Sequence, residues 1–307
     1  MFRLGLVGAG RMGRTHLRAL RDVTDVSIVA VAEPVDALRE QAVDEFDVVG
    51  YASLADMLES NDLDGVLIVT PSDSHVDVIT QVAAAGLPIL CEKPCGVNAE
   101  DTRRAQSIVR DADVALQIGY WRRFVPGLEL LREGILSGHF GDVLTLSCLQ
   151  WDGEPPSSAF RARSGGVFID MGVHEFDQAR WLTGGDFTTM AAFASPAISD
   201  PEVRDDPDSA QVLCETTSGA TVLVSLGRHY GDGDMASVEV FGSRDHVLLE
   251  FLNPEDGERA QLEALVRQAQ SFAEYAKGGP CRGASVEDAI AALEAAGRAA
   301  GQLAKSR

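Results

Sequence analysis

The sequence contains little positive charge, few aromatic residues and no long uncharged stretch. Lysine and arginine together number 26 against 47 aspartates and glutamates, which gives a formal net charge of −21. Because such a surface repels phosphate backbones and anionic lipid, we expect neither nucleic acid nor membrane partners. No uncharged run reaches the roughly 18 residues of a membrane span, and the first residues lack the features of a secretion signal. A protein this acidic needs local features to hold an anionic ligand.

Cysteine is also scarce, and its distribution does not suggest disulfide pairs. The five cysteines are odd in number and scattered, which predicts reduced thiols and a cytoplasmic location. Cys91 and Cys95 lie four residues apart, but no second pair completes a zinc site. We therefore expect buried or inert thiols and no metal bound by cysteine.

The length and the first part of the sequence predict a nucleotide-binding type of domain. A chain of 307 residues is longer than one compact core usually is, so two domains are expected. Residues 1–120 alternate helical stretches with short apolar runs that lack period-two alternation, as strands covered on both faces do. This pattern predicts an α/β domain with a doubly wound parallel sheet of the Rossmann type. The expected strands are 4–7, 27–32, 65–69, 88–91 and 114–118, and the expected helices are 12–21, 35–45, 54–60, 74–85 and 99–111.

After residue 120 the pattern changes to strands joined by short turns. These strands predict an α+β domain over residues 121–285 with an open antiparallel sheet. Residues 198–208 are rich in aspartate and proline and are expected to form an exposed loop. The last helix, 286–304, carries apolar residues on one face, and we expect residues 286–307 to pack back on the first domain. The expected strands are 143–151, 189–195, 210–217, 221–228, 237–241 and 247–251, with helices at 126–136, 167–182 and 260–275.

A glycine-rich turn follows the first expected strand. Gly8-Ala9-Gly10-Arg11-Met12-Gly13 fits G-x-G-x-x-G between a strand ending at Val7 and a helix beginning near Met12. In this context the motif binds dinucleotides. Gly8 would form the turn, Gly10 would let a pyrophosphate approach the backbone, and Gly13 would let helix and strand pack closely. The helix N-terminus adds amide donors and a partial positive charge.

The second expected strand ends at an acidic residue, Glu33, which lies 20 residues after Gly13. A carboxylate there can accept hydrogen bonds from the adenosine ribose hydroxyls, and it would repel a 2′-phosphate. The next two residues, Pro34 and Val35, supply no arginine. The sequence therefore favours NAD over NADP.

Three residues have the chemistry that oxidation of a secondary alcohol needs. Asp170 and His174 are four apart on an expected helix, so both side chains share a face. The carboxylate can orient the imidazole and raise its basicity, and the imidazole can then exchange a substrate proton. Lys93 ends a strand at the carboxyl edge of the first sheet, where its ammonium could stabilise a developing alkoxide. An Asp–His pair can also bind metal, but no convincing third ligand lies outside this helix, so no metal is expected.

These motifs resemble those of a known family. Gly8–Gly13, Glu92-Lys93-Pro94 and the segment from Gly165 to His174 together resemble the Gfo/Idh/MocA oxidoreductases, most closely their inositol 2-dehydrogenase branch. Residues 119–124 and 229–231 are also similar to that branch, and the resemblance runs from Leu4 to the last helix. It implies NAD-dependent oxidation, or the reverse reduction, of a secondary hydroxyl on a cyclic polyol such as an inositol, or on a sugar or related compound. It also implies a homodimer or homotetramer.

The resemblance implies roles for individual residues. Lys93, Asp170 and His174 correspond to the catalytic set. Three of the other positions have a plain structural alternative: His75 as a helix-start residue, Arg123 as a solvated arginine and Tyr230 as a core tyrosine. The implied cofactor contacts are Gly8, Gly10, Arg11, Met12, Gly13, Glu33, Thr70, Pro71, His75, Glu92 and Lys93, and the implied substrate contacts are Lys93, Arg123, Asp170, His174, Asp177 and Tyr230.

Two other functions are compatible with the same residues. Some relatives hold NAD tightly and use an internal redox cycle for glycoside cleavage or epimerisation, and a regulator could bind NAD without catalysis. The presence of Lys93, Asp170 and His174 together argues against the regulator.

The chain also departs from the family pattern after Phe251. It passes quickly into the helix at 260–275, where relatives usually carry a longer segment that shapes the substrate pocket. The shortening leaves the identity of the polyol open.

Overall fold

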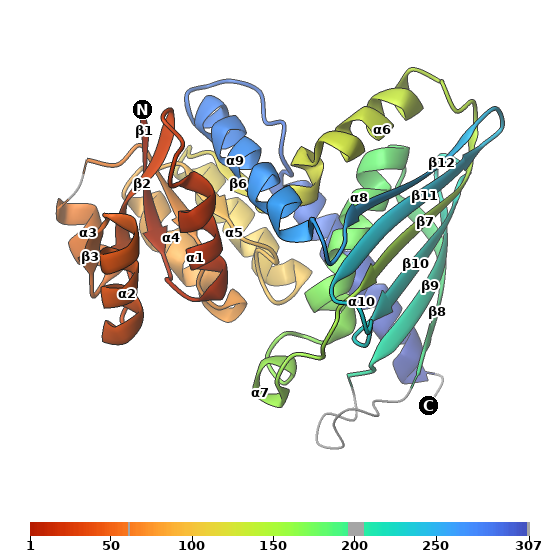
Figure 1. The fold of residues 1–307 in the computed structure, drawn as a ribbon, viewed down its shortest axis with the longest axis horizontal. Coiled ribbons are helices and arrows are strands. Elements are labelled where there is room, and N and C mark those ends of the chain that lie inside the picture. The colour runs from red at the N-terminus through yellow and green to blue at the C-terminus, as the bar shows by residue number, and fades with distance from the viewer. Residues whose placement is uncertain (61, 196–205, 306–307) are drawn as a thin grey trace. The chain divides into compact units, whose positions relative to one another are not determined.

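The structure, a computed structural model, describes residues 1–60, 62–195 and 206–305 and divides the chain into two compact units (Figure 1). Unit 1 comprises residues 1–124 and 262–290, and unit 2 comprises residues 125–261 and 291–307. The chain therefore leaves unit 1 after Phe124 and returns to it at Leu262. Across the described residues, no helix is both long enough and apolar enough to cross a membrane.

Unit 1 contains the parallel sheet that the sequence predicts, in the strand order β3-β2-β1-β4-β5-β6. The order reverses direction between β1 and β4, and ligands of such sheets bind outside the carboxyl ends of the strands at this switch point. The short strand β3 had no counterpart in the sequence prediction. The strands are β1 (Phe2–Val7), β2 (Val26–Ala32), β3 (Val49–Tyr51), β4 (Gly65–Ile68), β5 (Ile89–Cys91) and β6 (Leu116–Ile118).

Two helices of unit 1 begin after a polar residue whose side chain caps the helix. The hydroxyl of Ser53 accepts a hydrogen bond from the Asp56 amide at 3.1 Å, and the Asn98 side chain accepts one from the Asp101 amide at 2.9 Å. Each side chain satisfies an amide that the first helical turn leaves without a partner. The helices are α1 (Arg11–Leu20), α2 (Asp36–Phe46), α3 (Leu54–Ser60), α4 (His75–Ala84) and α5 (Ala99–Asp111), with short 3-10 turns at Ser72–Ser74 and Trp121–Phe124.

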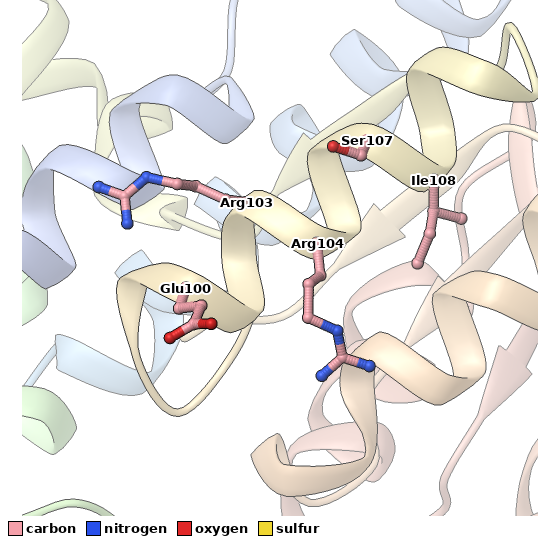
Figure 2. Close-up of a pocket in the computed structure, with 5 residues that line it drawn as sticks. All are labelled: Glu100, Arg103, Arg104, Ser107 and Ile108. Atoms are coloured by element: carbon pink, nitrogen blue, oxygen red, sulfur yellow. The ribbon is translucent and has the colours of Figure 1, made fainter.

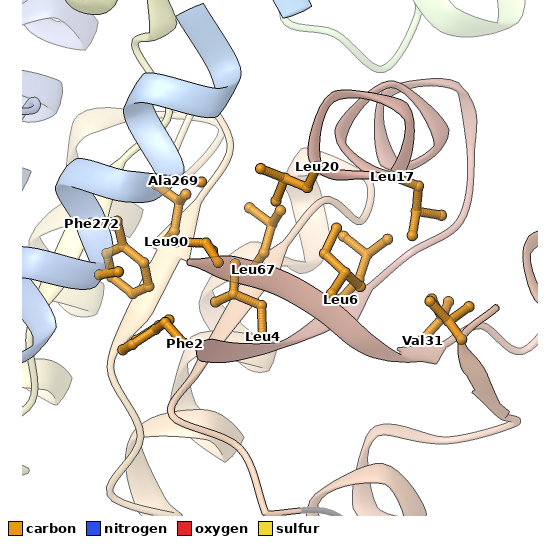
Figure 3. Close-up of a cluster of buried hydrophobic side chains, with 14 of the residues drawn as sticks. Phe2, Leu4, Leu6, Leu17, Leu20, Val31, Leu67, Leu90, Ala269 and Phe272 are labelled. Carbon is orange, nitrogen blue, oxygen red and sulfur yellow. The ribbon is translucent and has the colours of Figure 1, made fainter. Parts of the chain in front are cut away.

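A distant helix completes the core of unit 1. Phe272 of α9 (Gly257–Ala276) packs edge to face on Phe2, with ring centroids 5.9 Å apart, beside Leu4 and Leu90 (Figure 3). Burial of such large apolar side chains stabilises a fold by about 1.5–3 kcal/mol each. The return of residues 262–290 to unit 1 therefore follows from the apolar face of α9, although the sequence analysis had placed residues 262–285 in the second domain.

Unit 2 contains a six-stranded sheet in the order β12-β11-β7-β10-β9-β8. Its neighbouring strands run antiparallel except β7 and β10, which are parallel, with Leu146 opposite Val222. This pair corrects the expectation of a wholly antiparallel sheet. Parallel neighbours need a long crossover connection, and here the crossover contains α8, β8 and β9. The strands are β7 (Val143–Trp151), β8 (Phe187–Ala194), β9 (Ser209–Thr216), β10 (Thr221–Gly227), β11 (Met235–Gly242) and β12 (His246–Leu252).

Helix α8 (Val173–Thr183) packs on one face of this sheet, against β7 and β10 (Figure 1). The helix predicted at 167–182 is in fact two elements, because the π-helical turn η3 (Phe168–Gly172) precedes α8. Gly165 and Gly166 before it both have positive φ, at 81° and 84°, which non-glycine residues rarely adopt. The other helices are α6 (Pro126–Leu136), α7 (Ser158–Arg161) and α10 (Val286–Lys305), the last of which contributes to both units.

Candidate active site

The glycine turn lies at the switch point of the unit 1 sheet and has room for a ligand. Gly8 has a φ of +99°, and a Cβ on it would lie 2.8 Å from the Val69 carbonyl oxygen. A Cβ on Gly13 would lie 2.2 Å from the Gly8 carbonyl oxygen, so both glycines are required by the fold itself. A Cβ on Gly10 would meet no atom within 4 Å. The open space at Gly10, before the N-terminus of α1, fits a pyrophosphate.

Glu33 reaches from the end of β2 into this turn. Its buried carboxylate accepts hydrogen bonds from the Ala9 amide at 2.8 Å and from the Val35 amide at 2.9 Å. An ionised carboxylate has about four acceptor positions, so capacity for ribose hydroxyls is left after these two bonds. Glu33 therefore both stabilises the glycine turn and fits the predicted contact with ribose.

Arg39 is a residue near this position that the sequence analysis missed. Its guanidinium donates a hydrogen bond to the Glu33 carbonyl oxygen at 2.8 Å and pairs with Asp36. Arg39 lies six positions after Glu33, in the first turn of α2, beyond Pro34 and Val35, from which the sequence analysis argued. Arg39 is the group at this site that could attract a 2′-phosphate.

Lys93 follows β5 and is held by a buried acid. The Glu92 carboxylate is 2.7 Å from Nε2 of His16 in α1, and its other oxygen accepts a hydrogen bond from the Lys93 amide at 3.2 Å. His16 and Glu92 are both buried. Their contact joins the helix of the glycine turn to the turn that presents Lys93. The sequence analysis assigned no role to His16, so it missed this link.

His75 begins α4 and joins two loops at the carboxyl edge of the sheet. Its two ring nitrogens lie 2.8 Å from the Pro94 and Thr70 carbonyl oxygens. Burial lowers the pKa of His75, although both carbonyls act in the opposite direction. The structure thus places His75 at a helix start, the structural alternative, where its ring also links Thr70 to the Lys93–Pro94 turn.

Asp170, His174 and Asp177 lie along η3 and α8 in unit 2. His174 and Asp177 are buried, while the side chain of Asp170 is 16% exposed and pairs with Arg228, whose Nη1 lies 3.4 Å from Oδ2 of Asp170. Asp170 lies in the π-helical turn, and such turns occur frequently at functional sites. The arrangement provides a partly open carboxylate one turn before a buried imidazole.

Asp152 is a second acidic residue of this region that the sequence analysis missed. Burial raises the pKa of Asp152, and the charges of Asp234 and Asp170 act in the same direction, whereas Gln150 and Arg228 oppose them. Its main chain accepts a hydrogen bond from the Tyr230 amide at 2.9 Å, which brings one predicted substrate residue next to it. Asp152 directly follows β7, so its position at the end of a predicted strand could have identified it as a candidate site residue.

Arg123 has an internal partner in unit 1. Its guanidinium lies 3.1 Å from Asp288 in the first turn of α10 and is 7% exposed. A longer contact of 3.4 Å joins it to the Gly283 carbonyl oxygen. Asp288 and Gly283 are partners for the buried guanidinium within unit 1, so its burial does not point to a substrate. The substrate role of Arg123 stays a prediction.

A surface hollow elsewhere in unit 1 is lined by Glu100, Arg103, Arg104, Ser107 and Ile108 (Figure 2). All five residues belong to α5, and Arg104 pairs with Asp101 of the same helix at 3.2 Å. A hollow on one face of one helix does not enclose a ligand. Within the described ranges, no group of three histidine, cysteine or acidic side chains could hold a metal ion.

Together, the switch point, the glycine turn and the acid at the end of β2 define unit 1 as a dinucleotide-binding domain of the Rossmann type. Comparison with known sequences agrees with this class. Residues 2–120 match the description "Oxidoreductase family, NAD-binding Rossmann fold", and residues 128–247 match the "GFO/IDH/MocA C-terminal domain". The chain belongs to the Gfo/Idh/MocA family of oxidoreductases, and its cofactor is NAD, as the sequence analysis predicted.

Three relatives show how far the similarity extends. The "Rhizopine catabolism protein MocA" of Rhizobium meliloti is 49% identical, over 95% of this chain and 92% of that protein. An "Inositol 2-dehydrogenase" of Rhizobium meliloti (strain 1021) is 33% identical, over 99% of this chain and 98% of that protein. The crystal structure of a Sinorhizobium meliloti 1021 protein assigned as a myo-inositol dehydrogenase is 32% identical, covers 100% of this chain and 98% of its own, and superposes with a TM-score of 0.93. The predicted fold class is confirmed, and the chain is an oxidoreductase.

Proposed function

We propose that the protein oxidises, or in the reverse direction forms, a secondary hydroxyl on a cyclic polyol of the inositol type. The observation that carries this proposal is the likeness to an inositol 2-dehydrogenase along nearly the whole of both chains. The partly open Asp170 carboxylate, one turn before the buried imidazole of His174, supports it. NAD, when bound, supplies the hydride acceptor.

The chain's own residues would then have distinct tasks. His174 takes the proton of the substrate hydroxyl, and Asp170 orients its imidazole. The ammonium of Lys93 stabilises the developing alkoxide. Asp177 and Tyr230 are the remaining candidates for contacts with substrate hydroxyls in unit 2.

A substrate screen tests this function directly. The purified protein is incubated with inositol isomers, a rhizopine, aldoses and sugar acids, with NAD or NADP, and reduced cofactor is followed by absorbance. The rhizopine is included because of the 49% identical relative. Turnover of a cyclic polyol with NAD is expected. Cofactor that copurifies and never exchanges would favour an internal redox cycle, and binding without any turnover would favour a regulator.

Preference for NAD over NADP is proposed to depend on the charge of Glu33. Replacing Glu33 with serine should raise the use of NADP relative to NAD by about tenfold or more, because a like charge near a phosphate costs on the order of 1–4 kcal/mol. The ratio of kcat/KM for the two cofactors measures the effect. Adding Arg39→Ala to this variant should remove part of the gain. An unchanged ratio in Glu33→Ser would show that Glu33 does not select the cofactor.

We also propose that the sheet of unit 2 forms a contact between copies of the chain. On the face away from α8, Leu213 pairs with Leu223, and Leu213, Leu248 and Phe193 are 52%, 59% and 68% exposed. Exposed apolar side chains gathered on one sheet face mark interaction surfaces. A homodimer or homotetramer would cover them.

Light scattering tests this contact. Leu213→Lys is expected to lower the mass in solution toward that of a single chain, because a charge would be buried in the interface. Leu144→Lys is the matched control, since Leu144 is 54% exposed but has the same strand parity as the buried Leu146 and so points to the other face. Equal masses for wild type and Leu213→Lys would rule out this face as the interface.

We place the protein in the cytoplasm on the basis of its cysteines. Cys91, Cys95, Cys148 and Cys214 are buried, and Cys281 is exposed. Burial raises the pKa of Cys214 to about 12, which leaves its thiol protonated and unreactive.

A further inference from the structure

Unit 2 contains a cluster of four buried charged residues that the sequence analysis did not identify. Arg161 and Arg228 pair with Asp206 and Asp208, and the exposed fractions of the four side chains are 1%, 0%, 6% and 4% in that order. We call these four residues the buried charge cluster. The segment 198–208 was predicted to be an exposed loop. Residues 198–205 lie outside the described residues. For Asp206 and Asp208 the expected exposure is wrong, because both residues are buried.

Short contacts hold the buried charge cluster together. Nε of Arg161 lies 2.8 Å from Asp206, and Nη1 of Arg161 lies 3.0 Å from Asp208. Arg161 also donates to the Asp206 carbonyl oxygen. Nη2 of Arg228 lies 3.2 Å from the same Asp206 carboxylate. Asp206 is therefore shared by both guanidinium groups.

The buried charge cluster reaches the predicted catalytic turn at two points. Nη1 of Arg228 lies 3.4 Å from Oδ2 of Asp170. The carboxylate of Asp206 accepts a hydrogen bond from the Val167 amide at 2.7 Å, just before η3 begins. The contact with Arg228 thus holds the side chain of Asp170, and the contact with Asp206 holds the start of the turn.

The two arginines share Asp206 and each pairs with a different second carboxylate. Arg161 pairs with Asp208 at 3.0 Å, and Arg228 pairs with Asp170 at 3.4 Å. A buried ion pair is weak support for stability, since apolar residues of equal volume often stabilise a core as well. Its geometry, however, orients the groups that it joins. Other charged groups nearby are Asp152, whose charge interacts with those of Asp170 and Arg228, and His229, which lies 3.6 Å from Asp208.

We propose that Arg228 is a positioning residue for the proposed reaction, which it serves by orienting the Asp170 carboxylate so that this carboxylate can act on His174. The inference rests on the proposed function. Asp206, 3.2 Å from Nη2 of Arg228, holds the guanidinium in place.

The test compares Arg228→Lys with Arg161→Lys. Both variants keep the net charge and lose the forked guanidinium, so their effects on folding should be similar. Arg228→Lys is expected to lower kcat by about tenfold to a hundredfold, the effect of a small misplacement of a reacting group, with KM and NAD affinity nearly unchanged. Arg161→Lys should retain most of kcat. Equal losses of kcat in the two variants would show that the buried charge cluster acts only on folding and would overturn the proposal.

A second measurement does not need turnover. NMR of histidine-labelled protein, with the His174 signal assigned from His174→Gln, follows the titration of that imidazole. Arg228→Lys should give a lower pKa of His174 than wild type, because a misplaced carboxylate stabilises the imidazolium less while the local charge is unchanged. Arg161→Lys should leave it nearly unaltered. If the screen finds no alcohol substrate, the proposed function fails, and the NMR result still decides whether Arg228 orients Asp170. An unaltered His174 pKa in Arg228→Lys would contradict the inference.

Discussion

Replacing Lys93 with methionine is expected to lower turnover by about 10² to 10³-fold while NAD still binds. This range is the usual cost of removing one group that stabilises a developing oxyanion. Lys93 stands on a turn fixed by Glu92 and followed by Pro94, whose carbonyl oxygen contacts His75. Methionine keeps the length of the side chain and removes only the ammonium. Turnover is followed by absorbance of reduced cofactor, and NAD binding by calorimetry.

Lys277 provides the control for this variant. It is also in unit 1, is exposed and lies over the ring of Phe2, with its Nζ 5.4 Å from the ring centroid. Lys277→Met removes one positive charge from the same acidic protein and should keep nearly full turnover. Full turnover in Lys93→Met would refute the catalytic role. Loss of NAD binding together with turnover would instead show that Lys93 serves the cofactor.

The second large effect is expected at the glycine turn, where two glycines should respond in opposite ways. Gly10→Ala should weaken NAD binding by roughly tenfold to a hundredfold, because the new methyl group occupies space needed for the pyrophosphate, and overpacking costs about 1–3 kcal/mol. The fold should tolerate it, since nothing lies within 4 Å of the added Cβ. Because Gly10 is the N-cap residue of α1, the substitution should lower the free energy of unfolding by at most about 1 kcal/mol.

Gly13→Ala should act mainly on the stability of the fold, whereas Gly10→Ala should act mainly on NAD binding. Its Cβ would lie 2.2 Å from the Gly8 carbonyl oxygen, so α1 and the glycine turn must move apart. The free energy of unfolding should fall by about 1–3 kcal/mol or more. Chemical denaturation without cofactor and calorimetry with NAD separate the two effects. Unchanged NAD affinity in a stably folded Gly10→Ala would place the pyrophosphate elsewhere.

The local patterns of the sequence predicted most of unit 1. α3 and α5 have the bounds that the sequence analysis expected, and the predicted strands of the parallel sheet differ by one or two residues at their ends. Their signal is local, because each strand is a short apolar run and each cap is a side chain beside its own helix. The three-residue strand β3 escaped prediction, since its residues are exposed or half-buried and show no apolar run.

The pairing of strands in unit 2 could not be predicted from local patterns. Consecutive strands with short turns indicate hairpins, yet β7 lies between β10 and β11, far from its neighbours in the chain. The π-helical turn at Asp170 was also missed, and the carboxylate that binds the Val167 amide at its start, that of Asp206, comes from a distant part of the chain. Strand order and such contacts depend on residues that are far apart in sequence.

The sequence by itself determined the features on which the proposed chemistry depends: a glycine turn after a buried strand, Glu33 at the end of the next, and the motifs containing Lys93, Asp170 and His174. These features are short, and each is defined by residues that are close together in the chain. Only the tertiary structure decided which partners hold them: His16 on Glu92, Arg39 beside Glu33, and Arg228 with Asp206 on Asp170. A buried charge must find its counter-charge wherever the fold places one, and no local pattern specifies that position.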